Sequence, residues 1–324
     1  MKSKVALVRC NSYNQPEVNQ AVARGLDLLG GASAFVKPSE NLLLKVNLLA
    51  GDVPEKCVTT HPAVFRAVAE QFLAVGATVR YGDSPGFGSS GAAAKKAGIT
   101  DEAEALKLEA ADFKDGREVF FEEGSQNKKF FIANAVLDCD GLISLPKMKT
   151  HGLERFTGAV KNQFGCVVGM RKGEFHVKLP DATDFAKMLV DLNSYVKPRL
   201  YIMDGIIAME GNGPRGGTPR PMNVLLFSTD PIALDATCGI FGESELIGQI
   251  LRGHPLSRLC AGVNLTLVKR VLPMLKRYHS QTLVITGGVA LNGAMVSLVS
   301  ASCGMAVVVP EHPQHNGAIG CATL

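Results

Sequence analysis

Short apolar segments alternate along the chain with longer stretches in which apolar residues recur at helical spacing. The longer stretches predict helices over residues 15–29, 62–75, 92–112 and 184–195. The short runs predict strands over residues 4–9, 41–49, 77–81, 130–137, 141–145, 199–203 and 223–227. Residues 41–49 are apolar at nearly every position, as in a strand covered on both faces. This order of elements predicts an α/β fold in which a largely parallel sheet is flanked by helices.

Polar side chains recur where the predicted strands end, and a parallel sheet brings such ends to one edge. The carboxylates among them are Asp83, Asp204, Glu210 and Asp230. Together they predict a polar rim that could hold a divalent metal ion. Each also has a structural alternative, because Asp83 and Asp230 precede turn residues, and Glu210 could pair with Arg215.

A cluster of basic residues follows the apolar run at 141–145. Its members are Lys147, Lys149, His151, Arg155 and Lys161, and Arg171, Lys172 and His176 come soon after. Thr157 is expected to cap a helix whose free N–H groups favour an anion. Because Pro, Gly, Thr and Asn separate the charges, the segment predicts an anion-binding site. A solvated basic loop is the alternative, and no residue is assigned a catalytic role.

The composition narrows the classes of partner. The 324 residues carry a formal net charge of +4, which is too mild to indicate nucleic acid. There is no run of about eighteen apolar residues, so no membrane partner is expected. The first ten residues resemble a strand and not a signal peptide. The eight cysteines lie at least eighteen positions apart, so no iron–sulfur ligand set is expected, and reduced thiols in the cytoplasm are the default.

Several long motifs resemble the family known as domain of unknown function 362. They are KVNLLAGDVPEKCVTTHP, YGDSPGFGS, LPKMKTHGLERFTGAVKNQFGCVVGMRKGEFH, MDGIIAMEGNGPRGGTPR and STDPIALDAT. The resemblance implies an α/β domain at residues 1–237 and a link to anaerobic or iron–sulfur redox metabolism, without a known reaction. Members of that family often carry clustered cysteines, which this chain lacks.

The remaining residues, 238–324, are similar to the C-terminal end of the BadF/BadG/BcrA-type ATPases. CGIFGESELIGQILRG, ITGGVALNGAM and VPEHPQHNGAIGCATL carry the resemblance. It implies a small α/β fragment of actin-like ATPase type, in which Gly287, Gly288 and Asn292 would approach a nucleotide. A tight turn between strand and helix is the alternative. The phosphate loops and cluster cysteines of those ATPases are missing, so no complete ATP site is expected.

Three functions follow from these observations. The chain would bind an anionic small molecule at the basic segment, as an enzyme or a redox accessory. Alternatively, it would act as an activator ATPase of a 2-hydroxyacyl-CoA dehydratase. Thirdly, its tail would be a docking remnant for a redox or acyl-CoA dehydratase-type protein. The missing phosphate loops count against ATPase activity by this chain alone.

Overall fold

The structure is a computed structural model that describes residues 3–152, 154–169, 171–240, 268, 272, 275, 280–286 and 288–313. The chain divides into two compact units, residues 1–244 and 245–324. Each unit is described by itself. None of the described helices is long and apolar enough to cross a membrane.

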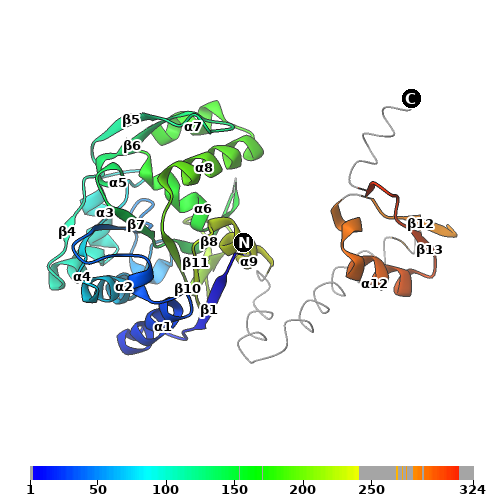
Figure 1. Cartoon of the computed structure of the whole chain (residues 1–324), viewed down its shortest axis with the longest axis horizontal. Coiled ribbons are helices and arrows are strands. Elements are labelled where there is room, and N and C mark those ends of the chain that lie inside the picture. The colour runs from blue at the N-terminus through cyan, green and yellow to red at the C-terminus, as the bar shows by residue number, and fades with distance from the viewer. Residues whose placement is uncertain are drawn as a thin grey trace. The chain divides into compact units, whose positions relative to one another are not determined.

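A mixed sheet forms the centre of the first unit (Figure 1). Its strand order is β1-β11-β10-β7-β2-β3-β4, and β8 and β9 extend it beside β10. The strands are β1 (Val5–Arg9), β2 (Asn41–Lys45), β3 (Thr78–Gly82), β4 (Glu109–Ala110), β7 (Gly141–Ser144), β8 (Lys147–His151), β9 (Arg155–Thr157), β10 (Leu200–Glu210) and β11 (Thr218–Ser228).

Most strand pairs of this sheet are parallel, which confirms the predicted α/β class. β2 is parallel to both β3 and β7, and β10 is parallel to β7 and β8. The β1–β11, β10–β11 and β8–β9 pairs are antiparallel. β8 continues the line of β7 after a break at Pro146, so the basic segment that was expected to be a loop is largely strand.

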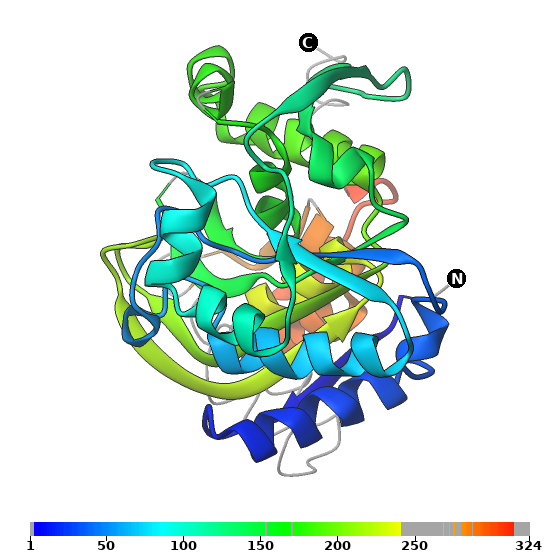
Figure 2. The same ribbon diagram turned by 90° about the vertical axis from the view of Figure 1, so that its left-hand side faces the viewer.

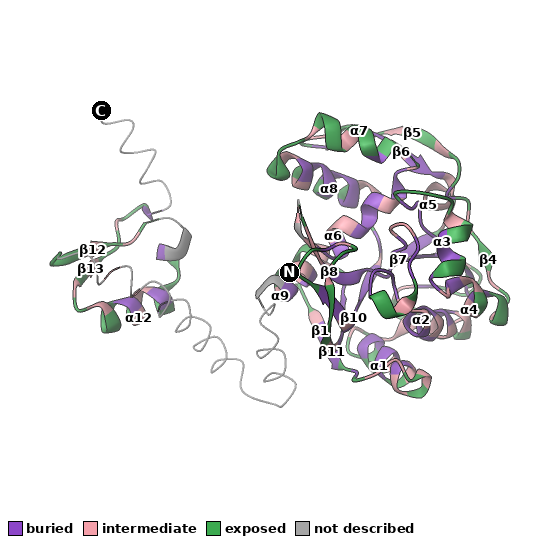
Figure 3. Cartoon of the chain, turned by 180° about the vertical axis from the view of Figure 1, so that it is seen from behind, coloured by how far each residue is buried: buried purple, intermediate pink, exposed green. Residues whose placement is uncertain are grey.

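Helices cover both faces of the sheet, as Figures 1 and 2 show. The helices are α1 (Gln15–Asp27), α2 (Pro62–Ala74), α3 (Ser90–Lys96), α4 (Ile99–Ala105), α5 (Asn134–Leu137), α6 (Ala159–Asn162), α7 (Arg171–Lys178), α8 (Ala182–Val196) and α9 (Pro231–Ile240). Leu42 and Leu44 pack with residues of α1, α2 and α4, whereas Leu43 points into a separate cluster with Leu142 and Phe113. This alternation explains why the three central residues of β2 are all apolar. Buried residues follow the central strands in Figure 3.

Several element boundaries differ from those expected. The long hairpin β10–β11 joins residues that were predicted as two short strands with a loop between them, because its glycines and prolines disguise the pairing. Residues 92–112 form α3, α4 and β4, with Gly98 at φ +72° ending the first helix. Residues 130–137 divide into β6 (Lys129–Ala133) and α5, and β6 pairs with β5 (Gly116–Phe120).

His61 is the N-cap residue of α2, and its Nδ1 accepts a hydrogen bond from the N–H of Ala63 at 3.1 Å. Thr60 donates to the carbonyl of Leu145 and accepts from the N–H of Asn47. Its hydroxyl therefore ties the loop after β2 to the end of β7.

The second unit contains a small parallel pair of strands beside a helix. β12 (Thr282–Val284) pairs with β13 (Ala306–Val308), and η4 (Gly288–Leu291) and α12 (Gly293–Cys303) lie between them in the chain. Met295 and Val299 of α12 are buried with Val268.

The expected domain boundary between Thr237 and Cys238 falls inside α9. Cys238 is buried, and its Sγ lies 3.5 Å from Sδ of Met203 on β10. The boundary at 237 stays a prediction, and these contacts extend the first unit at least to Cys238.

Candidate functional site

A cavity of about 480 Å³ opens where strands β2, β3 and β8 end. Such strand ends are the usual ligand position in open α/β sheets, and the volume lies within the range of small-molecule sites. Its polar lining residues are Asn47, Asp83, Ser84, Lys149, His151, Thr157, Lys161, Asn162, Lys172 and His176. The apolar part of the wall includes Leu49, Phe87 and Phe164.

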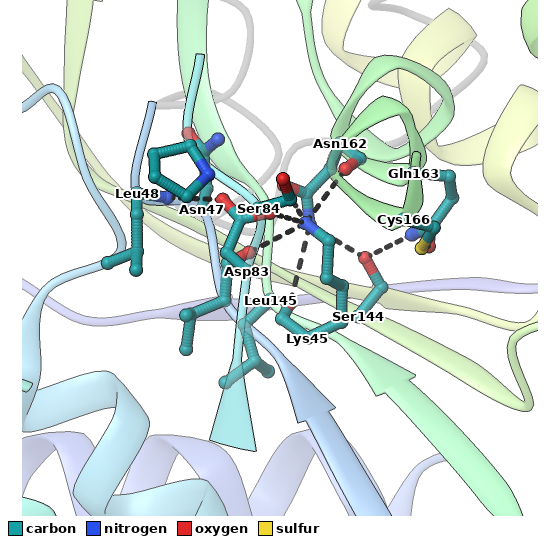
Figure 4. A network of polar contacts seen from close by, with 12 residues as sticks. Lys45, Asn47, Leu48, Asp83, Ser84, Ser144, Leu145, Asn162, Gln163 and Cys166 are labelled. Atoms are coloured by element: carbon teal, nitrogen blue, oxygen red, sulfur yellow. Dashed lines mark hydrogen bonds and ion pairs between the residues drawn. The ribbon is translucent and has the colours of Figure 1, made fainter. Parts of the chain in front are cut away.

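The floor of the site is a buried polar network around Lys45 (Figure 4). The Lys45 Nζ lies 2.7 Å from Oδ1 of Asp83 and donates to the carbonyls of Val46 and Asn162 at 2.8 and 2.9 Å. Oδ2 of Asp83 accepts from the N–H of Leu48 at 2.8 Å. The ammonium of Lys45 is therefore saturated, and the single carboxylate in the cavity wall is already neutralised.

Asn162 joins this network to the neighbouring strand. Its Nδ2 and the Nε2 of Gln163 both donate to the hydroxyl of Ser144, at 2.9 and 2.6 Å. Ser144 ends β7, so these contacts join the end of β7 to α6 and to the segment that follows α6. These contacts fix α6, which carries Lys161 into the cavity.

Lys149 is fully buried on β8, in the wall of the cavity. Its Nζ donates to Oδ1 of Asn47 at 2.6 Å and to the carbonyl of Val58 at 2.5 Å. Burial, and then the charge of Lys161, holds the pKa of Lys149 well below its usual range. Both acceptors are neutral, so the charged form of Lys149 has no hydrogen-bonded anion.

Lys161 has a different environment. It lines the cavity, and within the described part of the chain its ammonium has no hydrogen-bond or ion-pair partner. Burial lowers the pKa of Lys161 to about 8, although the carboxylate of Glu154 acts in the opposite direction. Lys161 is half-buried, and a largely desolvated charge without a partner is costly, so the arrangement favours an anion in the cavity.

Lys172 of α7 lies on the other side of the cavity. Its Nζ donates to Oγ of Ser84 at 2.7 Å and more weakly to the carbonyl of Pro85 at 3.4 Å. Burial lowers the pKa of Lys172 to about 8, against the attraction of Asp83. Lys161 and Lys172, each with a pKa of about 8, are mostly protonated at pH 7 and give the cavity positive charge.

Two histidines and a threonine complete the polar wall. Burial and the charge of Lys161 lower the pKa of His151 to about 4 and also lower that of His176, so both imidazoles are neutral at pH 7. His176 stacks on Phe185 at 4.6 Å between ring centroids. The hydroxyl of Thr157 is buried and has no hydrogen-bond partner among the described residues. Such a group in a cavity wall is a ready donor to a ligand.

The expectation that Thr157 caps a helix and leaves its N–H groups to an anion is wrong. Thr157 ends β9, and the N-cap residue of α6 is Gly158. Because glycine has no side chain, the cap residue itself makes no side-chain hydrogen bond to the first N–H groups of the helix. The carboxylate of Asp235 on α9 accepts from the N–H groups of Ala159 and Val160 at 2.7 and 3.0 Å. Burial raises the pKa of Asp235 to about 7, and the group that accepts from this helix end is therefore a side chain of the protein itself.

The structure brings three of the predicted basic residues together and separates a fourth. Lys149, His151 and Lys161 line the cavity, but Lys147 does not. The Nζ of Lys147 lies 2.8 Å from Oδ2 of Asp204 and 2.7 Å from the hydroxyl of Tyr13. Because this ammonium is committed to a buried ion pair, we leave Lys147 out of the candidate site. The side chain of Arg155 lies outside what the structure describes.

The four carboxylates of the expected rim do not converge. Asp83 and Asp204 each pair with a buried lysine. Asp230 caps α9 and accepts from the hydroxyl of Ser3. Glu210 is exposed, and its nearest basic group is Arg220 at 3.7 Å.

Two further observations bear on the rim. Arg215, the pairing partner considered for Glu210 under the structural alternative, pairs with Asp52 at 2.7 Å. In the part of the chain that the structure describes, no group of three or more His, Cys, Asp or Glu side chains is placed to hold a metal ion. The divalent metal stays a prediction without geometric support.

In the second unit, Asn292 has a structural role. Its Oδ1 accepts from the N–H of Met295 at 3.2 Å and so caps α12. Gly288 begins η4, and Gly287 lies outside the described residues. A tight turn between strand and helix was the alternative interpretation of this motif, and the cap at Asn292 belongs to such a turn. The contact with a nucleotide stays a prediction.

Sequence reasoning noted Lys172 and His176 in the basic segment without assigning them to the site. It did not single out Ser84 and Asn162, because the hydroxyl group of Ser84 and the amide group of Asn162 carry no charge that would distinguish them in the sequence. Their roles depend on contacts such as Lys172 with Ser84, which join residues 88 positions apart.

Comparison with known proteins places the chain in a family. The family described as domain of unknown function (DUF362) matches residues 42–239, and the chain belongs to it. A thylakoid-associated protein of Synechocystis sp. is 38% identical over 236 residues, which are 72% of this chain and 73% of that protein. Among solved structures, lactate racemase apoprotein from Thermoanaerobacterium thermosaccharolyticum covers 72% of this chain and 56% of its own, with 12% identity and a TM-score of 0.47.

A second group of relatives matches a smaller part of the chain. The 2-hydroxyisocaproyl-CoA dehydratase activator of Clostridioides difficile is 31% identical over 101 residues, 31% of this chain and 38% of that protein. The (R)-2-hydroxyglutaryl-CoA dehydratase activating ATPase of Acidaminococcus fermentans is 32% identical over 96 residues, 29% of this chain and 37% of that protein. The chain thus spans little more than a third of the length of these activators.

Proposed function

We propose that the first unit binds a small organic anion in the cavity at the ends of β2, β3 and β8. The observation that carries this proposal is the ammonium of Lys161, which lines the cavity and has no hydrogen-bond or ion-pair partner in the described part of the chain. Lys172 adds a second cation whose hydrogen bonds go to neutral oxygens, and the hydrogen bonds of Lys149 in the same wall also go to neutral oxygens. The carboxylate of Asp83 is neutralised by Lys45, so it does not balance them.

The same wall indicates the size and character of the anion. The cavity volume of about 480 Å³ exceeds that of a bare phosphate or carboxylate. Leu49, Phe87 and Phe164 provide apolar surface beside the cations. A molecule with one anionic end and an apolar body matches both parts.

Thermal unfolding in the presence of anions tests this function. Aryl and alkyl carboxylates and inorganic phosphate are added to the protein, to Lys161→Met and to Lys149→Met, with Lys187→Met as the matched control. Lys187 lies on the exposed surface of α8 and pairs there with Asp184. We expect carboxylates to raise the melting temperature of the wild type and of the control, but much less that of the two cavity variants. Equal shifts in all four proteins, or none, would count against the proposal.

The link to anaerobic or iron–sulfur redox metabolism comes from the family resemblance alone and stays a prediction. A cytoplasmic location also stays a prediction. Iron and sulfide analysis of protein purified without oxygen tests whether the chain itself holds a cluster, and finding both would contradict the expectation that it has no iron–sulfur ligand set.

An activator-type ATPase or docking remnant is the second candidate, and the similarity to dehydratase activators favours it. Hydrolysis requires groups that hold the β and γ phosphates and their metal ion, and the sequence offers no such loop. We therefore propose docking as the role of residues 238–324. ATP turnover above background that disappears in Gly288→Val would reverse this choice.

A further inference from the structure

The four lysines around the cavity are not equivalent. Lys45 is held by Asp83 and two carbonyls, and Lys149 is held by an amide oxygen and a carbonyl. Lys172 donates to a hydroxyl and more weakly to a carbonyl. Lys161 alone among them has no such partner within the described residues. Its amine is therefore the one that can change its bonding without breaking an existing contact.

We propose that Nζ of Lys161 forms an imine with the carbonyl carbon of a 2-oxo acid that carries an apolar side chain. This inference rests on the proposed function and names both the substrate class and the nucleophile of the same cavity. Lys149 and Lys172 are the partners for the carboxylate. Leu49, Phe87 and Phe164 are the surface for the side chain.

The protonation state of Lys161 suits a nucleophile. With a pKa of about 8, set chiefly by burial, about one molecule in ten carries the neutral amine at pH 7. An ordinary lysine has a neutral fraction several hundred times smaller. Placing an amine in an apolar wall beside other cations is an established means of activating it.

The step balances without an oxidant or a reductant. The lone pair of Nζ attacks the carbonyl carbon, a C–N bond forms, and the π electrons of C=O pass to the oxygen. The nitrogen loses one proton to a base and the oxygen takes one proton from an acid, which gives the neutral carbinolamine. The protonated base then gives its proton to the hydroxyl group, the C–O bond breaks and water leaves, and the nitrogen lone pair forms the C=N bond of a protonated imine that keeps one N–H.

The cavity wall contains groups for these proton transfers. His151 and His176 are neutral at pH 7, so each imidazole can accept or donate a proton. The buried hydroxyl of Thr157, which has no partner in the described part of the chain, can donate to the carbonyl oxygen. Both kinds of group line the same cavity as Lys161.

Reductive trapping tests the imine. The full-length protein is incubated with phenylpyruvate and cyanoborohydride, and intact mass and peptide mapping locate the secondary amine formed. Phenyllactate, which has the same shape and charge without the carbonyl, measures anion binding separately by calorimetry. Lys161→Arg keeps a cation but cannot form an imine, and Lys187→Arg is the matched surface control.

We expect one adduct per chain, mapped to Lys161, and we expect phenyllactate to suppress it. The adduct should be absent from Lys161→Arg and present in Lys187→Arg. Phenyllactate binding without any adduct on Lys161 would overturn the imine and leave the anion site intact. If the protein shows neither phenyllactate binding nor an adduct, both the anion site and the imine are overturned. Because the adduct is mapped on the wild-type protein, poor folding of a variant does not affect this decision.

Discussion

Gly165 lies directly against the carboxylate of Asp83. A Cβ at this position would overlap Oδ1 of Asp83 and would lie 2.7 Å from Nζ of Lys45. The carboxylate of Asp83 and the ammonium of Lys45 form one ion pair, which is buried under the cavity. The absence of a side chain at position 165 is therefore what allows the η3 segment (Gln163–Cys166) to cover this pair.

Gly165→Ala is expected to destabilise the protein by about 1–3 kcal/mol, because the methyl group forces a buried ion pair apart. Urea unfolding followed by circular dichroism measures this change. Gly91→Ala in α3 is the control, since no atom lies within 4 Å of its Cβ position. That variant should be neutral or slightly more stable. Equal effects of the two substitutions would contradict the packing described.

Lys161→Met is expected to stabilise the anion-free protein at pH 7 by roughly 1–3 kcal/mol, because it removes a charge that burial disfavours. The folded pKa of about 8 lies below the ordinary value of 10.5. Between these values the unfolded chain holds a proton that the folded chain has lost, so wild-type stability rises with pH there. The advantage of the variant should therefore shrink from pH 8 to above pH 10. Denaturant midpoints at several pH values, compared with Lys187→Met, measure it; a constant difference would contradict the lowered pKa.

Anion affinity is expected to fall as the pH rises through 8. Lys161 and Lys172 both have a pKa of about 8, so both lose their charge in this range. Phenyllactate stays ionised throughout, and its dissociation constant should increase roughly tenfold between pH 7 and pH 9. Calorimetric titration of the wild type and of Lys172→Met checks this. Binding that does not change with pH would mean that neither ammonium contacts the anion.

A chain that ends at Ser244 is expected to unfold cooperatively and more stably than one that ends at Thr237. The shorter chain loses the end of α9 and with it Cys238, which is buried beside Met203. We expect a difference of about 1–3 kcal/mol, the usual effect of losing a buried side chain. Urea midpoints of the two chains give the comparison. If both chains aggregate, residues 245–324 are needed for folding, and neither residues 1–237 nor residues 1–244 form an independent domain.

The alternation of apolar and polar positions determined much of the fold by itself. Residues 41–49 indicated a strand with two covered faces, and Leu42, Leu43 and Leu44 indeed point into two different clusters. Local spacing suffices for this, since successive side chains of a strand face opposite sides of the sheet. The clustering of Lys149, His151 and Lys161 near a strand end was visible in the same way.

Only the tertiary structure decided which charges are available to a ligand. Lys147 and Lys149 are two positions apart on β8, yet the first pairs with Asp204, whereas the hydrogen bonds of the second among the described residues go to the neutral oxygens of Asn47 and Val58. The partner of each lysine comes from a segment 57 to 102 positions away. Asp235 likewise reaches the start of α6 across 76 positions and takes the place that an external anion was expected to occupy. Spacing along the chain fixes which residues share a strand face, whereas the pairing of buried charges depends on how distant segments pack.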